Sequence, residues 1–173
     1  EGQPDRSVAI SWTVTNSGPG NAEGAWVDRV YLSSDGTLSG SPLLGESLHD
    51  GGLAAGKSYS QTKNLTLPRV GDGNYRIVIQ TDAVDAVFEG KPASVAENNN
   101  LTASVSRIEM LHPDLQVPQV NVPGGLIQGF PVRLPISWTV SNDGLRGSLA
   151  ATWSDQIVLS RNAVLGDGDD QVV

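Results

Sequence analysis

The chain has 173 residues, a formal net charge of −8 and no cysteine. The eleven Lys and Arg residues form no basic stripe, so we expect no nucleic-acid partner. Without Cys, a disulfide framework, a Cys-based zinc site and a Cys nucleophile are excluded. The two histidines lie in no recognisable catalytic motif, so the sequence predicts no enzyme. Twenty Gly, ten Pro and only 17% charged residues are typical of a turn-rich, strand-rich protein.

One strand pattern occurs twice, as ISWTVTNSGPG in residues 10–20 and as ISWTVSNDGLR in residues 136–146. Apolar and polar residues alternate in both copies, which predicts half-buried strands with Trp12 and Trp138 on the inner face. An Asn-x-Gly triplet follows each strand, and both residue types tolerate the backbone of a turn. Each triplet therefore predicts the end of its strand.

A second strand also repeats, as WVDRVYLS in residues 26–33 and as WSDQIVLS in residues 153–160. When residues 10–19 and 26–33 are aligned with their counterparts, 11 of 18 positions are identical, and the offset changes from 126 to 127 in the loop between the two segments. An insertion confined to a loop indicates a true structural repeat. Further strands are expected over residues 58–67, 74–81 and 101–106, which together predict an all-β sandwich.

A new unit opens at residues 112–114 with an irregular, proline-broken strand, which predicts an edge strand. We therefore expect one unit over residues 1–108 that lacks this opening strand, and the first part of a second unit over 109–173. Residues 107–113 are the expected linker. Residue 1 is Glu, and neither a signal peptide nor a membrane-spanning apolar run is visible, so we expect a segment of a longer tandem array. The open strand edges are expected to pair with a neighbouring repeat or another copy of the chain.

Short motifs in a fixed order cover nearly the whole chain. They are ISWTV with Asn-x-Gly, Trp26-x-Asp28, Val30-Tyr31-Leu32-Ser33-x-Asp35, Leu53 to Tyr59, Gly73-Asn74-Tyr75, Thr81-Asp82, Glu97-Asn98-Asn99 and, in the second unit, Pro113-Asp114-Leu115. In this order they resemble the CARDB domain, the cell adhesion related domain found in bacteria. The second copy departs from the pattern at Arg161-Asn162, where the first has Ser34-Asp35.

The resemblance implies an immunoglobulin-like β-sandwich in tandem copies within large secreted or cell-surface bacterial proteins, and it implies no reaction. We expect a structural spacer or adhesion module whose partners are neighbouring repeats and a glycan or other cell-surface ligand. One alternative is a subunit of an extracellular filament, sheath or surface layer that assembles as a homo-oligomer by strand exchange. Another is an accessory module of a secreted enzyme.

The inward side of the repeated strands carries aromatic and acidic residues. Trp12, Trp26, Trp138 and Trp153 are predicted to pack in the core rather than to form a carbohydrate platform. Asp28 and Asp155 share the inward positions, and a buried carboxylate must be hydrogen-bonded or bound to metal. We expect them to accept backbone N–H groups from the Asn-x-Gly loop.

Oxygen-bearing side chains gather in a stretch that suits Ca²⁺, which takes 6–8 oxygen ligands. The alternative is a polar loop without metal. The candidate ligands are Asp82, Asp85, Glu89, Glu97, Asn98 and Asn99. Residues 166–172, GDGDDQV, imitate one turn of a calcium-binding nonapeptide repeat, but a single copy favours a solvated loop that holds at most a weakly bound ion.

Overall fold

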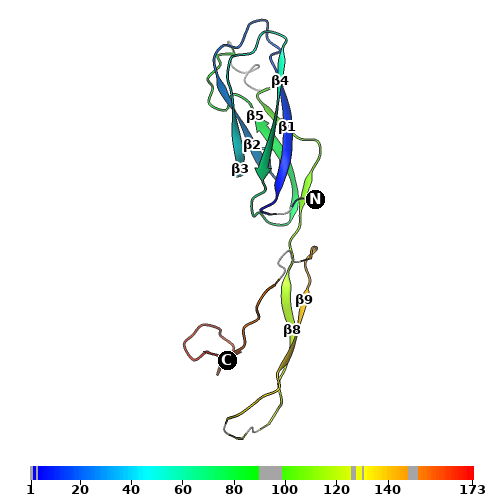
Figure 1. Cartoon of the computed structure of the whole chain (residues 1–173), viewed down its shortest axis with the longest axis vertical. Coiled ribbons are helices and arrows are strands. Elements are labelled where there is room, and N and C mark those ends of the chain that lie inside the picture. The colour runs from blue at the N-terminus through cyan, green and yellow to red at the C-terminus, as the bar shows by residue number, and fades with distance from the viewer. Residues whose placement is uncertain (1, 3, 90–98, 126–127, 130, 148–151) are drawn as a thin grey trace.

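The computed structural model describes the chain except residues 1, 3, 90–98, 126–127, 130 and 148–151. The described part is elongated, with a β-sandwich at one end and a long hairpin at the other (Figure 1). No helix in it is long and apolar enough to cross a membrane. Its strands are β1 (Ser7–Thr15), β2 (Trp26–Ser33), β3 (Leu43–His49), β4 (Ser58–Thr66), β5 (Gly73–Gln80), β6 (Leu101–Ala103), β7 (Ile108–Met110), β8 (Leu115–Asn121), β9 (Ser137–Asn142), β10 (Val158–Leu159) and β11 (Gln171–Val172).

The first repeat is a sandwich of two antiparallel sheets, which confirms the predicted all-β, immunoglobulin-like class. One sheet pairs β1 with β4 along their whole length, in a register that places Trp12 opposite Gln61. The other has the strand order β3-β2-β5-β6, and β7 continues it by pairing with the first half of β5. The strands expected over 58–67 and 74–81 correspond to β4 and β5, whereas β3 was not among the expected strands.

Alternation along the strands builds the core between these two sheets. Successive side chains of a strand point to opposite faces, so every second residue of β1 and β2 turns inward. Burial of such apolar side chains is the main favourable term in folding. The buried core cluster consists of Ile10, Trp12, Val30, Leu32, Leu65, Leu67, Ile77 and Met110.

The first repeat extends two residues beyond its expected boundary at residue 108. Met110 was assigned to the second unit, but its side chain is fully buried in the first core. β7 also pairs with β5 in the register Gly73↔Met110, inside the stretch expected to be linker. The sequence prediction missed this because three residues are too few to show a strand pattern.

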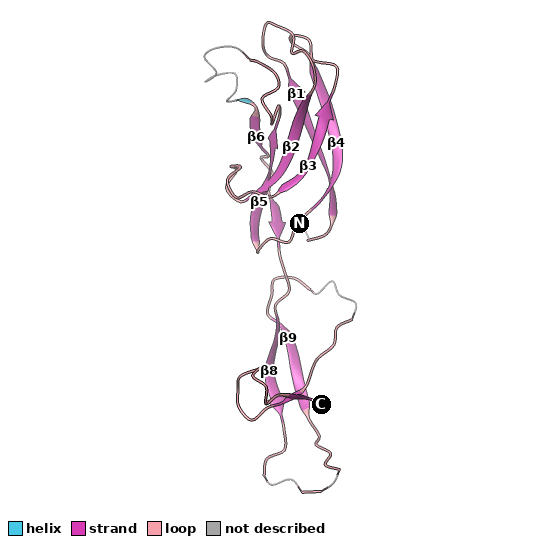
Figure 2. Ribbon diagram, turned by 90° about the vertical axis from the view of Figure 1, so that its left-hand side faces the viewer, coloured by secondary structure: helices cyan, strands magenta, loops and turns pink. Residues whose placement is uncertain are grey.

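The second repeat contributes the hairpin β8–β9 and the short pair β10–β11. Figure 2 shows β8 and β9 side by side below the sandwich. The strand expected over residues 153–160 is wrong in extent, because only Val158 and Leu159 are in a strand. Its counterpart β2 lies between β3 and β5, and in the described residues no such strands flank residues 153–157. An extended segment without ladder partners is not a strand.

Truncating Met110 tests whether β7 belongs to the first core. Met110→Ala should lower the free energy of unfolding by about 2–5 kcal/mol, because it leaves a cavity between the sheets. The matched control Val105→Ala removes a side chain that is 92% exposed and should change stability by less than about 0.5 kcal/mol. Urea unfolding followed by tryptophan fluorescence measures both. Equal effects would contradict the placement of β7.

Candidate functional site

A buried carboxylate joins the two sheets of the first repeat. Asp28 on β2 is completely buried. Its Oδ2 accepts hydrogen bonds from Trp12 Nε1 and from the Tyr59 hydroxyl, both at 2.8 Å. Its Oδ1 accepts one from Thr81 Oγ1 at 2.7 Å. The predicted inward position of Asp28 is confirmed. The predicted backbone donors are wrong, because side chains from the facing sheet and from the end of β5 take their place.

Aromatic rings surround this carboxylate. Trp26 is 4% exposed, which confirms its predicted core position, and its Nε1 donates to the Tyr59 hydroxyl at 3.0 Å. The His49 ring stacks on Tyr59 with the ring centroids 3.8 Å apart. Burial raises the pKa of the Tyr59 hydroxyl well above its usual range, and the hydrogen bond to Asp28 acts in the same direction. The hydroxyl therefore stays protonated and remains a donor to Asp28.

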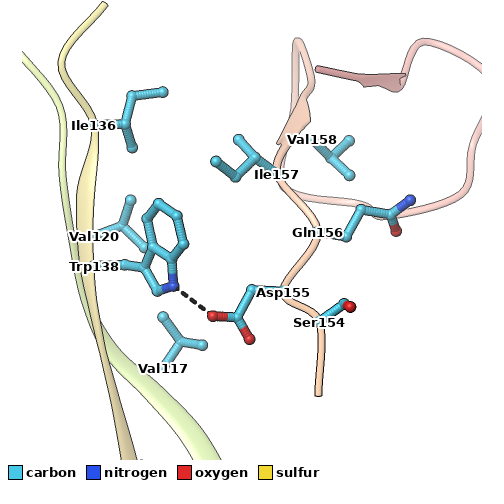
Figure 3. A pocket seen from close by; sticks show the side chains of 9 residues that line it. All are labelled: Val117, Val120, Ile136, Trp138, Ser154, Asp155, Gln156, Ile157 and Val158. Atoms are coloured by element: carbon cyan, nitrogen blue, oxygen red, sulfur yellow. Dashed lines mark hydrogen bonds between the residues drawn. The ribbon is translucent and has the colours of Figure 1, made fainter. Parts of the chain in front are cut away.

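The same indole–carboxylate bond recurs in the second repeat, but at the surface. Trp138 Nε1 donates to Asp155 Oδ2 at 2.9 Å (Figure 3). However, Trp138 is 38% exposed, Trp153 is 56% exposed and Asp155 is also exposed. The prediction that these three residues lie in a core is therefore wrong for this structure. In the described part of the second repeat, the segment that leads into the short β10–β11 pair lies opposite β8 and β9 across a cavity and leaves the indole and the carboxylate exposed.

A cavity of about 470 Å³ lies between the β8–β9 hairpin and the segment that carries Asp155. The side chains of Val117, Val120 and Ile157 line it together with the Trp138 indole (Figure 3). These residue types match those that fill the core of the first repeat. The lining contains one carboxylate and no histidine, so it offers no acid–base pair for catalysis.

The predicted calcium ligands after β5 are only partly described. The two carboxylate oxygens of Asp82 accept the backbone N–H groups of Ala86 and Val87, at 2.8 and 2.9 Å. Glu89 Oε2 accepts a hydrogen bond from Asn100 Nδ2 at 3.1 Å. Asp82 and Asp85 both adopt positive φ, as residues of a turn do. Asn99 is exposed, while Glu97 and Asn98 lie outside the described residues. Calcium binding by this set stays a prediction.

A different loop brings three carboxylates together. Oxygens of Asp167, Asp169 and Asp170 lie within 4.8 Å of one another. Asn162 Nδ2 donates to Asp167 at 2.7 Å, and the Gly166 backbone N–H, donating to Asp170, lowers the pKa of that carboxyl. These three carboxylates belong to the GDGDDQV segment, which is predicted from the sequence to be a solvated loop.

The two-sheet sandwich and its repeated Trp–Asp bond define an immunoglobulin-like repeat module. The CARDB family model matches residues 1–104, more than half of the chain, and the chain therefore belongs to the CARDB family. CARDB domains are adhesion-related domains of bacterial cell-surface proteins. The match ends before the second repeat begins, so that unit is assigned by its sequence identity to the first. No curated protein and no solved structure matches the chain.

Removing the buried carboxylate tests how much of the sandwich depends on it. Asp28→Ala leaves Trp12, Tyr59 and Thr81 without their acceptor and should cost about 3–5 kcal/mol of unfolding free energy. Asp155→Ala removes the equivalent group at the surface and should cost less than about 1 kcal/mol. Thermal and urea unfolding measure both variants. Similar losses of unfolding free energy in the two variants would contradict the idea that burial makes Asp28 more important for stability than Asp155.

Proposed function

We propose that the chain is a non-catalytic spacer in an adhesion-related bacterial cell-surface protein, and that it works by holding successive repeats at a fixed angle. Family membership supports the adhesion-related class. The main structural support for the spacer role is the connection between the two repeats. Residues 111–114 join the sandwich to the hairpin, and the two lie end to end (Figures 1 and 2).

This connection is bonded to both repeats. On the side of the first repeat, His112 Nδ1 lies 2.5 Å from Asp72 Oδ1. On the side of the second, Asn142 Oδ1 accepts the Asp114 backbone N–H at 2.9 Å, and the Asp143 backbone N–H donates to the Asp114 carbonyl at 2.8 Å. A short linker fixed at both ends resists bending more than a free linker of the same length.

A glycine allows the connection to pack closely against the second repeat. A Cβ at Gly144 would overlap the backbone at Asp114 and lie 2.5 Å from the His112 carbonyl oxygen. Gly144 therefore serves the close approach of two backbone segments. Gly18, its counterpart in the first repeat, has no such neighbour. A Cβ there would meet Asn16 Oδ1 at 3.2 Å, a side-chain atom that can shift.

Introducing a methyl group at the joint tests the spacer role. Gly144→Ala should displace residues 112–114 and widen the distribution of angles between the repeats, while Gly18→Ala should leave it unchanged. Small-angle X-ray scattering of the full chain measures the maximum dimension and the spread of conformations. Equal scattering from wild type and both variants would argue against a fixed joint. A hydrolytic activity of the purified chain would overturn the non-catalytic role.

Calcium is expected to stiffen the array, and melting curves test this part of the proposal. Millimolar Ca²⁺ should raise the melting temperature, and a chelator should reverse the change. Asp169→Asn and Asp85→Asn distinguish which of the two acidic loops binds Ca²⁺, because each substitution removes one charged candidate ligand from one loop only. The loop whose variant loses the shift is the binding loop. Identical melting with Ca²⁺ and with chelator would rule out the calcium contribution.

A further inference from the structure

The strand β4 has two edges, and in the described residues only the edge next to β1 is paired. Bonded residues alternate along an antiparallel strand. The Asn16 backbone N–H donates to the Lys57 carbonyl, and the Leu67 backbone N–H donates to the Arg6 carbonyl. Odd-numbered residues of β4 therefore bond to β1, and the backbone groups of its even-numbered residues point to the free edge. Figure 2 shows β4 at the side of the sandwich away from β6.

The strand that opens a repeat does not cover this edge of β4. In the second repeat the Asp143 backbone N–H donates to the Asp114 carbonyl, so β8 bonds to the odd-numbered residues of β9. The repeat offset of 126 preserves this parity, whereas β4 bonds to the even-numbered residues of β1. A strand equivalent to β8 would therefore lie on the far edge of β1. The edge of β4 stays free in a repeat that has its opening strand in place.

The end strand of the other sheet, β3, is less suited to pairing than β4. Its ladder with β2 has a register shift, and its Glu46 carbonyl accepts a hydrogen bond from Lys63 Nζ of β4. Irregular ladders and lysine side chains both keep edge strands from pairing. By contrast, the nine residues of β4 pair with β1 without a register shift. The only charged side chain of β4, Lys63, is the one that bonds to β3.

We propose that the free edge of β4 binds the same edge of a second copy of the chain, as an antiparallel pair with a two-fold axis at Thr62. This inference goes beyond the spacer role, because it assigns a surface through which two chains bind each other. A two-fold interface uses the same surface of both copies. Main-chain hydrogen bonds to a free sheet edge are a general mode of recognition. With Thr62 on the axis, β4 is paired over its whole length, Ser58–Thr66.

The outward side chains of β4 suit such a pair. They belong to its even-numbered residues, which are all exposed and uncharged: Ser58, Ser60, Thr62, Asn64 and Thr66. Three of their hydroxyls already pair with hydroxyls of β1 at 2.8 Å, as Thr62 does with Ser11. A hydroxyl offers one donor and two acceptor positions, so each can also bond to the second copy. Polar cross-strand pairs of this kind stabilise antiparallel sheets.

Charge favours this register over its neighbour. With the axis at Thr62, Lys63 lies opposite Gln61 of the second copy. With the axis at Lys63, the two lysines would oppose each other, which destabilises a strand pair. The net charge of −8 on each chain repels the copies at longer range, and salt screens this repulsion. Since the two strands are antiparallel, the two β8–β9 hairpins would extend from opposite ends of the pair (Figure 1).

Single cysteines in the full chain test the register, because the chain has no cysteine of its own. Thr62→Cys places two thiols across the axis, where bonded Cα atoms lie about 5.5 Å apart, within disulfide range. Thr66→Cys places them about 27 Å apart, since Thr66 lies opposite Ser58 of the second copy. Under mild oxidation, non-reducing electrophoresis should show a linked dimer for Thr62→Cys and a monomer for Thr66→Cys. Equal cross-linking of both variants, or none of Thr62→Cys, would overturn the proposal.

Sedimentation velocity of the unmodified chain, in about 0.5 M NaCl to screen the like net charges, measures the association itself. Thr62→Lys sets two like charges against each other and should weaken dimerisation at least about fivefold. Thr13→Lys adds the same charge to the outward side of β1, away from the axis, and should change it by less than about twofold. Unfolding curves check that both variants fold, and the cysteine pair decides the matter if they do not. A chain that stays monomeric at millimolar concentration, or equal effects of the two lysines, would contradict the proposed pairing.

Discussion

The bond from Trp12 to Asp28 is the interaction on which the sandwich depends most. A buried carboxylate is costly unless its oxygens are satisfied. Here three donors converge on it, two from β1 and β4 and one from the residue after β5. The indole comes from one sheet and the carboxylate from the other, so the bond fixes their relative position as well as their separation. Burial of apolar side chains alone does not fix the relative position of the sheets, because its free energy depends on the area removed from water and not on direction.

The two repeats show that the same residues acquire different roles in different surroundings. Trp138 and Asp155 repeat the indole–carboxylate bond with nearly the same length, but both side chains are reached by water. Local sequence therefore suffices to bring the pair together, and facing strands are needed to bury it. This part of the hydrogen-bond network is therefore present in the second repeat without a closed core.

Much of the fold could be predicted from alternation and repetition, since β1, β4, β5 and the turns after β1 and β9 follow directly from residue patterns. β7 could not, because a strand of three residues has no visible period and is held by β5 and by the burial of Met110. The side-chain donors to Asp28 were also missed. Tyr59 and Thr81 lie 31 and 53 residues from Asp28, and no local spacing indicates that they meet. The convergence of three carboxylates in the loop around Asp167 also depends on a turn that the sequence pattern does not specify.

The bonded connection at residues 111–114 has a geometric consequence for any array that repeats it. A joint that fixes both bend and twist relates each unit to the next by one rotation and one translation, which together define a screw operation. The same face of every unit would then return at a constant angular step along the array. The close backbone approach at Gly144, which leaves no room for a methyl group, would help to set that angular step.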